Sequence, residues 1–169
     1  KEGNEFNGIL KYLTAKTKGN IHDNGTIAIT SNYIRSSKNF EHHPKNLVNY
    51  ENNSSYHSSG APNTYVCFDF KDKKIQLTSY SIKTNPDPSN EEHLRNWTIE
   101  VSNDGNNWYT IDIRSNDSTL NGSNRVANFD IQQKSNYFYR YVRLMQTGMN
   151  WCNNNYVYFS LIEFFGKIE

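Results

Sequence analysis

Trp151 is the residue in this chain best placed to serve as a binding platform. It lies in the polar stretch 148–155, outside any alternating pattern that would bury it, and Asn150, Asn153 and Tyr156 are close to it in sequence. An aromatic ring beside amide side chains can stack on a sugar or anchor a protein partner, because both need a flat apolar face with polar groups at its edge. The alternative is that Trp151 closes the end of the domain, and the sequence leaves both open.

A second group of candidate residues lies in the aperiodic stretch 31–45. Its members combine aromatic rings, imidazoles and a guanidinium group: Tyr33, Arg35, Phe40, His42 and His43. An exposed ring beside an arginine again suits a sugar or a protein contact. Tyr33 and Phe40 can also fold back to cover the end of the domain, so both interpretations stand for these two rings.

Tyr56 and His93, each in a polar stretch, complete the candidate ligand-binding residues. We expect the stretch around His93, residues 85–95, to be a solvated loop. It also carries Glu91 and Glu92, but adjacent carboxylates point apart in an extended segment, which is poor geometry for acid–base catalysis. The sequence therefore predicts no catalytic residue.

The sequence lacks the residue patterns that metal binding, nucleophilic catalysis and phosphate binding require. The histidines and cysteines show no paired spacing typical of a metal site. There is no Gly-x-Ser-x-Gly elbow for a nucleophile and no glycine-rich loop for a phosphate. The sequence predicts a protein that is not an enzyme and needs no cofactor. Cys67 and Cys152 are able to pair, but two cysteines are few for a secreted scaffold, so we expect free thiols in a reducing compartment.

Charge and length narrow the class of partner. The 169 residues carry 18 Lys and Arg against 17 Asp and Glu, a formal net charge of +1, without a basic tract. Electrostatic capture of nucleic acid or of an anionic membrane is therefore not expected. The length suits one domain, and no signal peptide or transmembrane run is visible. We expect an intracellular protein, with this chain as one part of a larger multidomain chain.

Strands must position the candidate residues, because apolar and polar residues alternate along most of the chain. Residues 97–113 read as a hairpin, with two alternating runs joined by a polar turn that contains Asp-Gly. The apolar spacing over 5–13 predicts a short helix. The other predicted strands are 27–30, 65–70, 75–84, 126–131, 140–144 and 156–165. Together these make about eight strands, which indicates an all-β antiparallel sandwich or jelly roll.

Four segments resemble the discoidin family, also called coagulation-factor type C domains. They are the hairpin 97–108, the strand 65–70, the Arg-aromatic-hydrophobic-Arg strand 140–144 and the closing strand 161–166, in the order of that family. The resemblance implies an eight-stranded antiparallel jelly-roll sandwich of the galactose-binding-like class, with a short N-terminal helix. It also implies a non-catalytic module whose ligand meets loops at one end of the barrel. Here those loops are 31–45, 51–63, 85–95 and 146–155.

The resemblance divides the chain into an N-terminal extension, residues 1–24, and the domain itself, residues 25–169. The segments 8–14 and 19–23 are similar to a subgroup of intracellular protist proteins in which the domain follows a BTB adaptor module. The implied ligand is a protein or a glycan, and an intracellular adaptor favours a protein. A structural or oligomerisation domain of a larger chain is an alternative.

Two properties of some relatives are not expected here. Glycan-binding relatives hold a structural calcium ion beside an aspartate, whereas this chain has Asn49 there, which leaves Ser55 and Glu163 as oxygen ligands. Calcium takes roughly six to eight oxygens, so we expect no calcium site. Membrane-binding relatives expose apolar pairs at loop tips. The loops 31–45 and 51–63 show no such pair, so phospholipid binding is a less favoured alternative.

Overall fold

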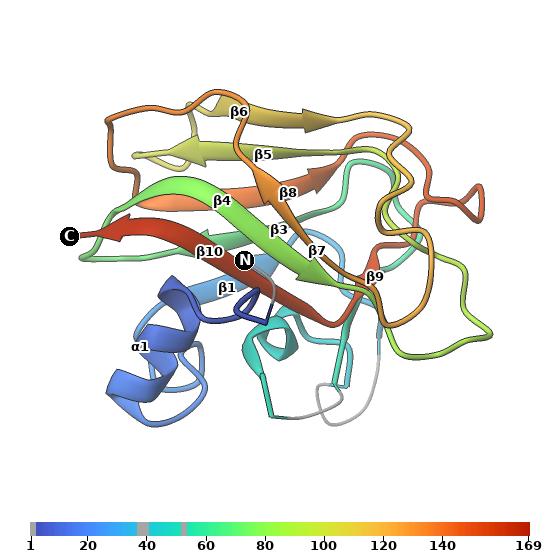
Figure 1. Ribbon diagram of the computed structural model, residues 1–169, viewed down its shortest axis with the longest axis horizontal. Helices are drawn as coiled ribbons and strands as arrows, with labels where there is room; N and C mark the ends of the chain where they lie inside the picture. The colour runs from blue at the N-terminus through green and yellow to red at the C-terminus, as the bar shows by residue number, and fades with distance from the viewer. Residues whose placement is uncertain (1–2, 37–40, 52–53) are drawn as a thin grey trace.

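The computed structural model describes residues 3–36, 41–51 and 54–169 and confirms the predicted β-sandwich (Figure 1). Within this part of the chain, two facing antiparallel sheets contain eight strands. The first sheet has the order β1 (Ala28–Ser31), β3 (Tyr65–Asp69), β8 (Tyr141–Gln146), β5 (Trp97–Ser102) and β6 (Tyr109–Arg114). The second sheet has the order β10 (Leu161–Ile168), β4 (Ile75–Lys83) and β7 (Val126–Asp130).

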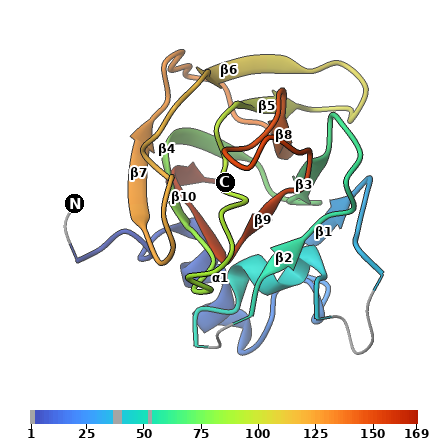
Figure 2. The same cartoon turned by 90° about the vertical axis from the view of Figure 1, so that its right-hand side faces the viewer.

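A short ribbon at one end of the sandwich was not predicted from the sequence. It pairs β2 (Tyr56–His57) with β9 (Tyr158–Phe159). The 3-10 helix η1 (Pro44–Val48) precedes it. The predicted strand 156–165 is therefore two strands, because β9 pairs with β2 whereas β10 pairs with β4. Figure 2 looks onto the end at which the ribbon lies.

The inner faces of the two main sheets form one aromatic-rich core. Phe68 of β3 and Phe164 of β10 meet across it with ring centroids 5.0 Å apart, and Tyr80 stacks on Phe129 at 5.2 Å. Trp97 is fully buried and donates its indole N–H to the Tyr80 hydroxyl, 2.9 Å away. The alternating apolar residues of most predicted strands thus point inward, as expected from the strand period of two. Strand β6 differs, because Tyr109 and Ile113 are exposed there, whereas Asp112 is buried and accepts the hydroxyl of Tyr80.

The N-terminal helix begins later than predicted. Helix α1 (Ile9–Thr17) starts at residue 9 and not at residue 5. Its start is set by Glu163 of β10, whose carboxylate accepts the N–H groups of Gly8, Leu10 and Lys11 at 2.7–3.0 Å. The first N–H groups of a helix have no partner within it and need such an acceptor. Local spacing cannot reveal an acceptor that comes from the other end of the chain.

The N-terminal segment packs into the core of the sandwich. Ile9, Leu10, Leu13 and Ile21 are all buried there, so residues before position 25 share one core with the strands. The division of the chain at that position stays a prediction. In the described part of the chain, no helix has both the length and the apolar character needed to cross a membrane.

Glu163→Ala is expected to destabilise the domain by about 2–4 kcal/mol, because it leaves three N–H groups at the start of α1 without an acceptor. Urea unfolding followed by tryptophan fluorescence measures this loss. Glu91→Ala removes an exposed carboxylate and is the matched control, which should unfold like the wild-type protein. An unchanged midpoint for Glu163→Ala would contradict the role given to this side chain.

Candidate functional site

The described parts of the four predicted loops gather at one end of the sandwich, as expected. β1, β6 and β8 end there, and β3 and β5 begin there. This end is on the right of Figure 1 and faces the viewer in Figure 2. The ribbon of β2 and β9 lies at the same end, so side chains from the ribbon and from the loops can act together.

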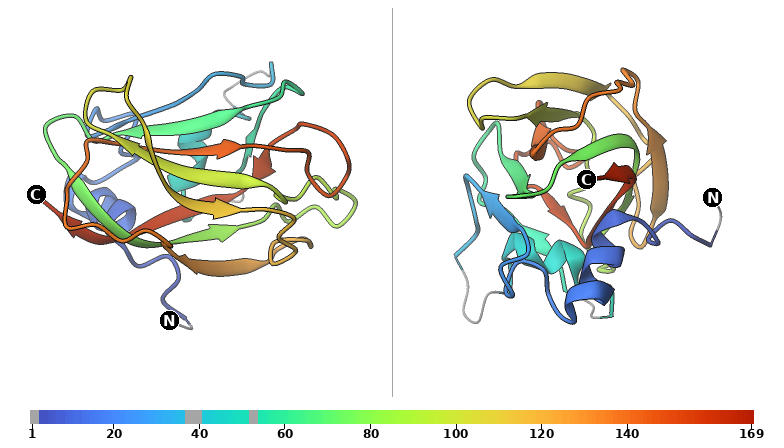
Figure 3. Two further views of the ribbon diagram at one scale, coloured as in Figure 1. Left: turned by 90° about the horizontal axis from the view of Figure 1, so that it is seen from above. Right: turned by 90° about the vertical axis from the view of Figure 1, so that its left-hand side faces the viewer.

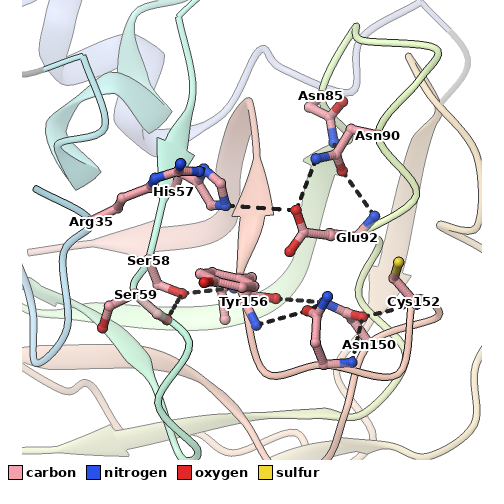
Figure 4. Close-up of polar contacts among 12 residues, drawn as sticks. Arg35, His57, Ser58, Ser59, Asn85, Asn90, Glu92, Asn150, Cys152 and Tyr156 are labelled. Carbon is pink, nitrogen blue, oxygen red and sulfur yellow. Dashed lines mark hydrogen bonds and ion pairs between the residues drawn. The ribbon is translucent and has the colours of Figure 1, made fainter. Parts of the chain in front are cut away.

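His57 is the centre of a side-chain cluster at this end (Figure 4). Its ring stacks on Tyr158 of the paired strand, with centroids 4.4 Å apart and an interplanar angle of 17°. Tyr156 lies 5.5 Å away at a tilt, and His42 meets the ring edge-on at 5.4 Å. These rings leave His57 only 4% exposed.

The polar neighbours of His57 fix its tautomer. Arg35 Nη1 lies 3.2 Å from His57 Nδ1, and a guanidinium group only donates, so Nδ1 accepts and Nε2 carries the proton. Nε2 faces Oε1 of Glu92 at 3.8 Å, which is too long for a hydrogen bond. Among the described residues, neither His57 Nε2 nor Glu92 Oε2 has a hydrogen-bond partner, although both atoms are buried. We call Arg35, His57, Glu92 and Tyr156 the loop-end cluster.

His57 is a neutral imidazole at neutral pH. Burial lowers its pKa to about 4, and the charge of Arg35 and the neighbouring His42 act in the same direction. The contact with Glu92 is therefore not an ion pair, since the imidazole carries no charge. Glu92 is held by Asn90, whose amide donates to Oε1 at 3.0 Å. Among the described residues, the cluster thus buries one unpaired donor, on His57, beside one unpaired acceptor, on Glu92, and neither atom is open to solvent.

The loop 146–155 is shaped by Asn150, a predicted ligand contact that is fully buried. Its amide nitrogen donates to the Asn154 side chain at 2.6 Å and to the Tyr156 carbonyl at 2.8 Å. Its amide oxygen accepts the N–H of Cys152 at 2.9 Å. Asn150 therefore positions Tyr156 but is not itself available to a ligand, which corrects the prediction.

Trp151 is half-buried, and its contacts favour the interpretation in which it closes the end of the domain. The indole N–H donates to the carbonyl of Asp117 at 3.0 Å. The guanidinium of Arg95 lies 4.5 Å from the ring centroid and covers one face of the ring. The backbone N–H donates to the carbonyl of His93 at 3.1 Å. Trp151 thereby connects its own loop to the loop of Asp117 and to the loop 85–95.

Tyr33 is 43% exposed and the adjacent Ile34 is 41% exposed. The expectation that the loop 31–45 shows no exposed apolar pair is therefore wrong. Asn153 is also exposed, with a left-handed φ of 56°. The predicted contact Phe40 lies outside the described residues.

Three other predicted contacts are structural, which corrects their assignment. Tyr56 is fully buried, with its hydroxyl 2.6 Å from Ser31 Oγ. His43 caps η1 by accepting the N–H of Lys45 at 2.9 Å. His93, expected on a solvated loop, is only 3% exposed. Buried or capping side chains of this kind position loops and do not meet a ligand.

The three residues considered for calcium do not form a ligand set. Asn49 accepts from the amide of Asn20 at 2.7 Å, Ser55 pairs with the hydroxyl of Ser160 at 2.9 Å, and Glu163 caps α1. In the described part of the chain, no group of three His, Cys, Asp or Glu side chains is arranged to hold a metal ion. Cys67 and Cys152 are free thiols, as expected.

Sequence reasoning missed His57 and Glu92, the two central members of the loop-end cluster. Glu92 looked like an exposed loop carboxylate, and His57 belongs to no spacing motif. His57 is placed by the β2–β9 ribbon, which the sequence pattern did not predict, and Glu92 reaches it from the loop 85–95. The only available signal was the position of His57 in a loop that other candidate residues also occupy.

The fold and this end together define a galactose-binding-like β-sandwich with its polar and aromatic cluster on the loops. A profile of the F5/8 type C domain family matches residues 12–164, and the chain belongs to this family. No curated protein sequence matches the chain significantly.

Solved structures similar to this chain include carbohydrate-binding modules. CpGH89CBM32-5 from Clostridium perfringens, in complex with GalNAc-β-1,3-galactose, has a TM-score of 0.67 and 13% identity, covering 84% of this chain and 96% of that one. The family 32 module of NanJ from C. perfringens, in complex with galactose, has a TM-score of 0.62 and 10% identity, covering 86% and 95%. CBM32-3 of a C. perfringens family 31 glycoside hydrolase has a TM-score of 0.64 and 18% identity, covering 86% and 94%. At sequence identities of 10–18%, this similarity establishes a shared fold and nothing more.

His57 is expected to make stability fall as the pH is lowered from about 6.5 to about 4. The unfolded chain binds a proton to this histidine in that window while the folded chain does not, so the free energy of unfolding falls by at most ~1.4 kcal/mol per pH unit. Above pH 6.5 the contribution of His57 is fully present. Urea unfolding at several pH values should give a shallower slope for His57→Gln than for the wild-type protein. Equal slopes would contradict a neutral, buried His57.

Proposed function

We propose that this domain is a non-catalytic carbohydrate-recognition module that binds a sugar at the loop-end cluster. Domains of this family are binding modules, and the similar solved structures include complexes with galactose and with GalNAc-β-1,3-galactose. The proposal depends on the chemistry of the cluster more than on this likeness.

The observation that carries the proposal is that an exposed cation, Arg35, and a half-buried ring, Tyr156, both contact the buried His57. His57 Nε2 and Glu92 Oε2 are closed to solvent, so this pair positions Arg35 and Tyr156 and does not itself meet the sugar. The exposed guanidinium of Arg35 and the half-buried ring of Tyr156 lie beside the pair. A cation that donates to hydroxyl oxygens and a ring that stacks on C–H groups are what a sugar needs.

Arg35→Ala is expected to weaken binding of galactose or of GalNAc-β-1,3-galactose about tenfold or more, because a hydrogen bond from a charged donor contributes roughly 1.5–3 kcal/mol. Isothermal titration calorimetry measures the affinity. Arg125→Ala, which removes an exposed arginine outside the cluster, is the control and should bind like the wild-type protein. Equal affinities for Arg35→Ala and the wild-type protein would contradict a sugar site at the cluster.

A protein partner is the second candidate, and the exposed apolar side chains at the same end favour it. Tyr33 and Ile34 are adjacent and exposed, and Met149 on the loop 146–155 is 52% exposed. Aromatic and apolar groups surrounded by polar loops are typical anchors of protein interfaces. A partner of this kind would bind beside the loop-end cluster without using His57 or Glu92.

Tyr33→Ala tests the protein partner. The variant should bind a purified partner protein more weakly by roughly 1–2 kcal/mol, the effect of removing an aromatic anchor, because it deletes the largest exposed ring of this patch. Surface plasmon resonance measures the change, with Tyr137→Ala, which removes an exposed ring from the segment before β8, as the control. If free galactose abolishes capture of the partner and Tyr33→Ala does not affect it, the loop-end cluster binds a glycan of that partner instead.

A further inference from the structure

The outer face of the three-stranded sheet carries a trough that the strand register builds. Phe165 of β10 lies opposite Ser79 of β4, and Ser79 lies opposite Asp130 of β7. The three side chains therefore form one row across the sheet, with the smallest in the middle. The outer two lie about 10 Å apart, twice the spacing of neighbouring strands. Because Ser79 is smaller than Phe165 and Asp130 on either side of it, the row forms a concave surface.

The N-terminal segment closes one side of this trough. Asn4 and Asn7 line it together with the row of Phe165, Ser79 and Asp130, and the hollow measures about 700 Å³. Figure 2 and the right panel of Figure 3 show this segment on the outer side of β10 and β7. The segment is held in place by the bond from Gly8 N–H to Glu163 at 3.0 Å.

A second hollow of about 290 Å³ continues the trough past the aromatic wall. Phe165 and Asn7 line both hollows, and the second one extends to Tyr12 of α1, which is 53% exposed. The groove is therefore longer than a single ring-sized pocket and is open along the sheet. An elongated, open groove suits the interior of a chain-like ligand better than the terminal unit of one.

The polar side chains of the trough are exposed to solvent, and the charged one among them is a carboxylate. The Asp130 carboxylate has no hydrogen-bond or ion-pair partner among the described residues. Asn128 donates its amide N–H to Ser81 Oγ at 3.0 Å, which orients the amide and leaves its oxygen free. No lysine or arginine is among the described residues that line the two hollows. A carboxylate and amides beside an aromatic ring bind hydroxyl and amino groups and repel anions.

We propose that this trough is a second carbohydrate-binding site, which takes the interior of a neutral or amino-sugar oligosaccharide. Asp130 and Asn128 accept from hydroxyl or amide N–H groups of the sugar, and Phe165 stacks on one ring. The site lies on a sheet face, away from the loop-end cluster. It does not rest on the function proposed for that cluster, and each can stand without the other.

NMR titration of the wild-type domain tests the trough with three soluble tetrasaccharides: cellotetraose, N-acetylchitotetraose and β-1,4-galactotetraose. At about 10 mM sugar, enough to fill a site with a Kd of about 1 mM, at least one of them should shift the amide signals of Ser79, Asn128, Asp130 and Phe165. Asp130→Asn keeps the shape of the side chain and removes its charge, and it should weaken that binding at least fivefold.

Two controls separate the trough from the loop-end cluster. Asp72→Asn changes a carboxylate in an exposed turn and should leave the titration unchanged, and Arg35→Ala should leave the trough signals shifting as in the wild-type domain. Shifts confined to residues around His57 and Tyr156 would overturn the second site while supporting the first. The absence of any shift at the trough with all three sugars, or equal affinities for Asp130→Asn and the wild-type domain, would also overturn it.

Discussion

Asparagine side chains supply the hydrogen bonds on which the loop end depends. Loops have no strand ladder, so their buried N–H and carbonyl groups need other partners. Asn150 satisfies several such groups within one loop. Asn46 bridges two segments by donating to the carbonyls of Glu41 and Ser55, each at 3.1 Å. Because one amide carries two donors and one acceptor, an asparagine-rich chain can build an ordered end from irregular backbone.

This ordered end holds His57 and Glu92 in an arrangement that costs the domain stability. A buried donor or acceptor that lacks a partner costs about 1–3 kcal/mol. The domain tolerates this cost because the stack of His57 on Tyr158 and the bond from Asn90 to Glu92 fix both groups. The fixed pair in turn holds Arg35 and Tyr156 in place for a ligand, so that the loops need not rearrange. Preorganisation of this kind is what a weak, polar ligand needs, since it spares the entropy of ordering the site.

The sequence was sufficient where structure follows from local patterning. Alternation located the main strands, and the resemblance to the discoidin family implied that four loops lie at one end. It was insufficient where a distant partner decides the outcome. The start of α1 depends on Glu163, and the hydroxyl of the buried Tyr56 finds its partner in Ser31. Asn150 was misjudged for a related reason, because a polar residue in a polar loop looks exposed until its hydrogen bonds are known.

Glu163 also links the helix to the second surface of the domain. Its carboxylate lies on the same face of β10 as Phe165, two residues along the strand, and it holds the segment that forms the side wall of the trough. The loop end exposes the cation Arg35, whereas the trough exposes the anion Asp130. An acidic sugar chain is repelled by the carboxylate of Asp130 in the trough, whereas the loop end offers it the cation Arg35. The two surfaces therefore differ in electrostatic preference as well as in shape, since one is built from loops and the other from strand register.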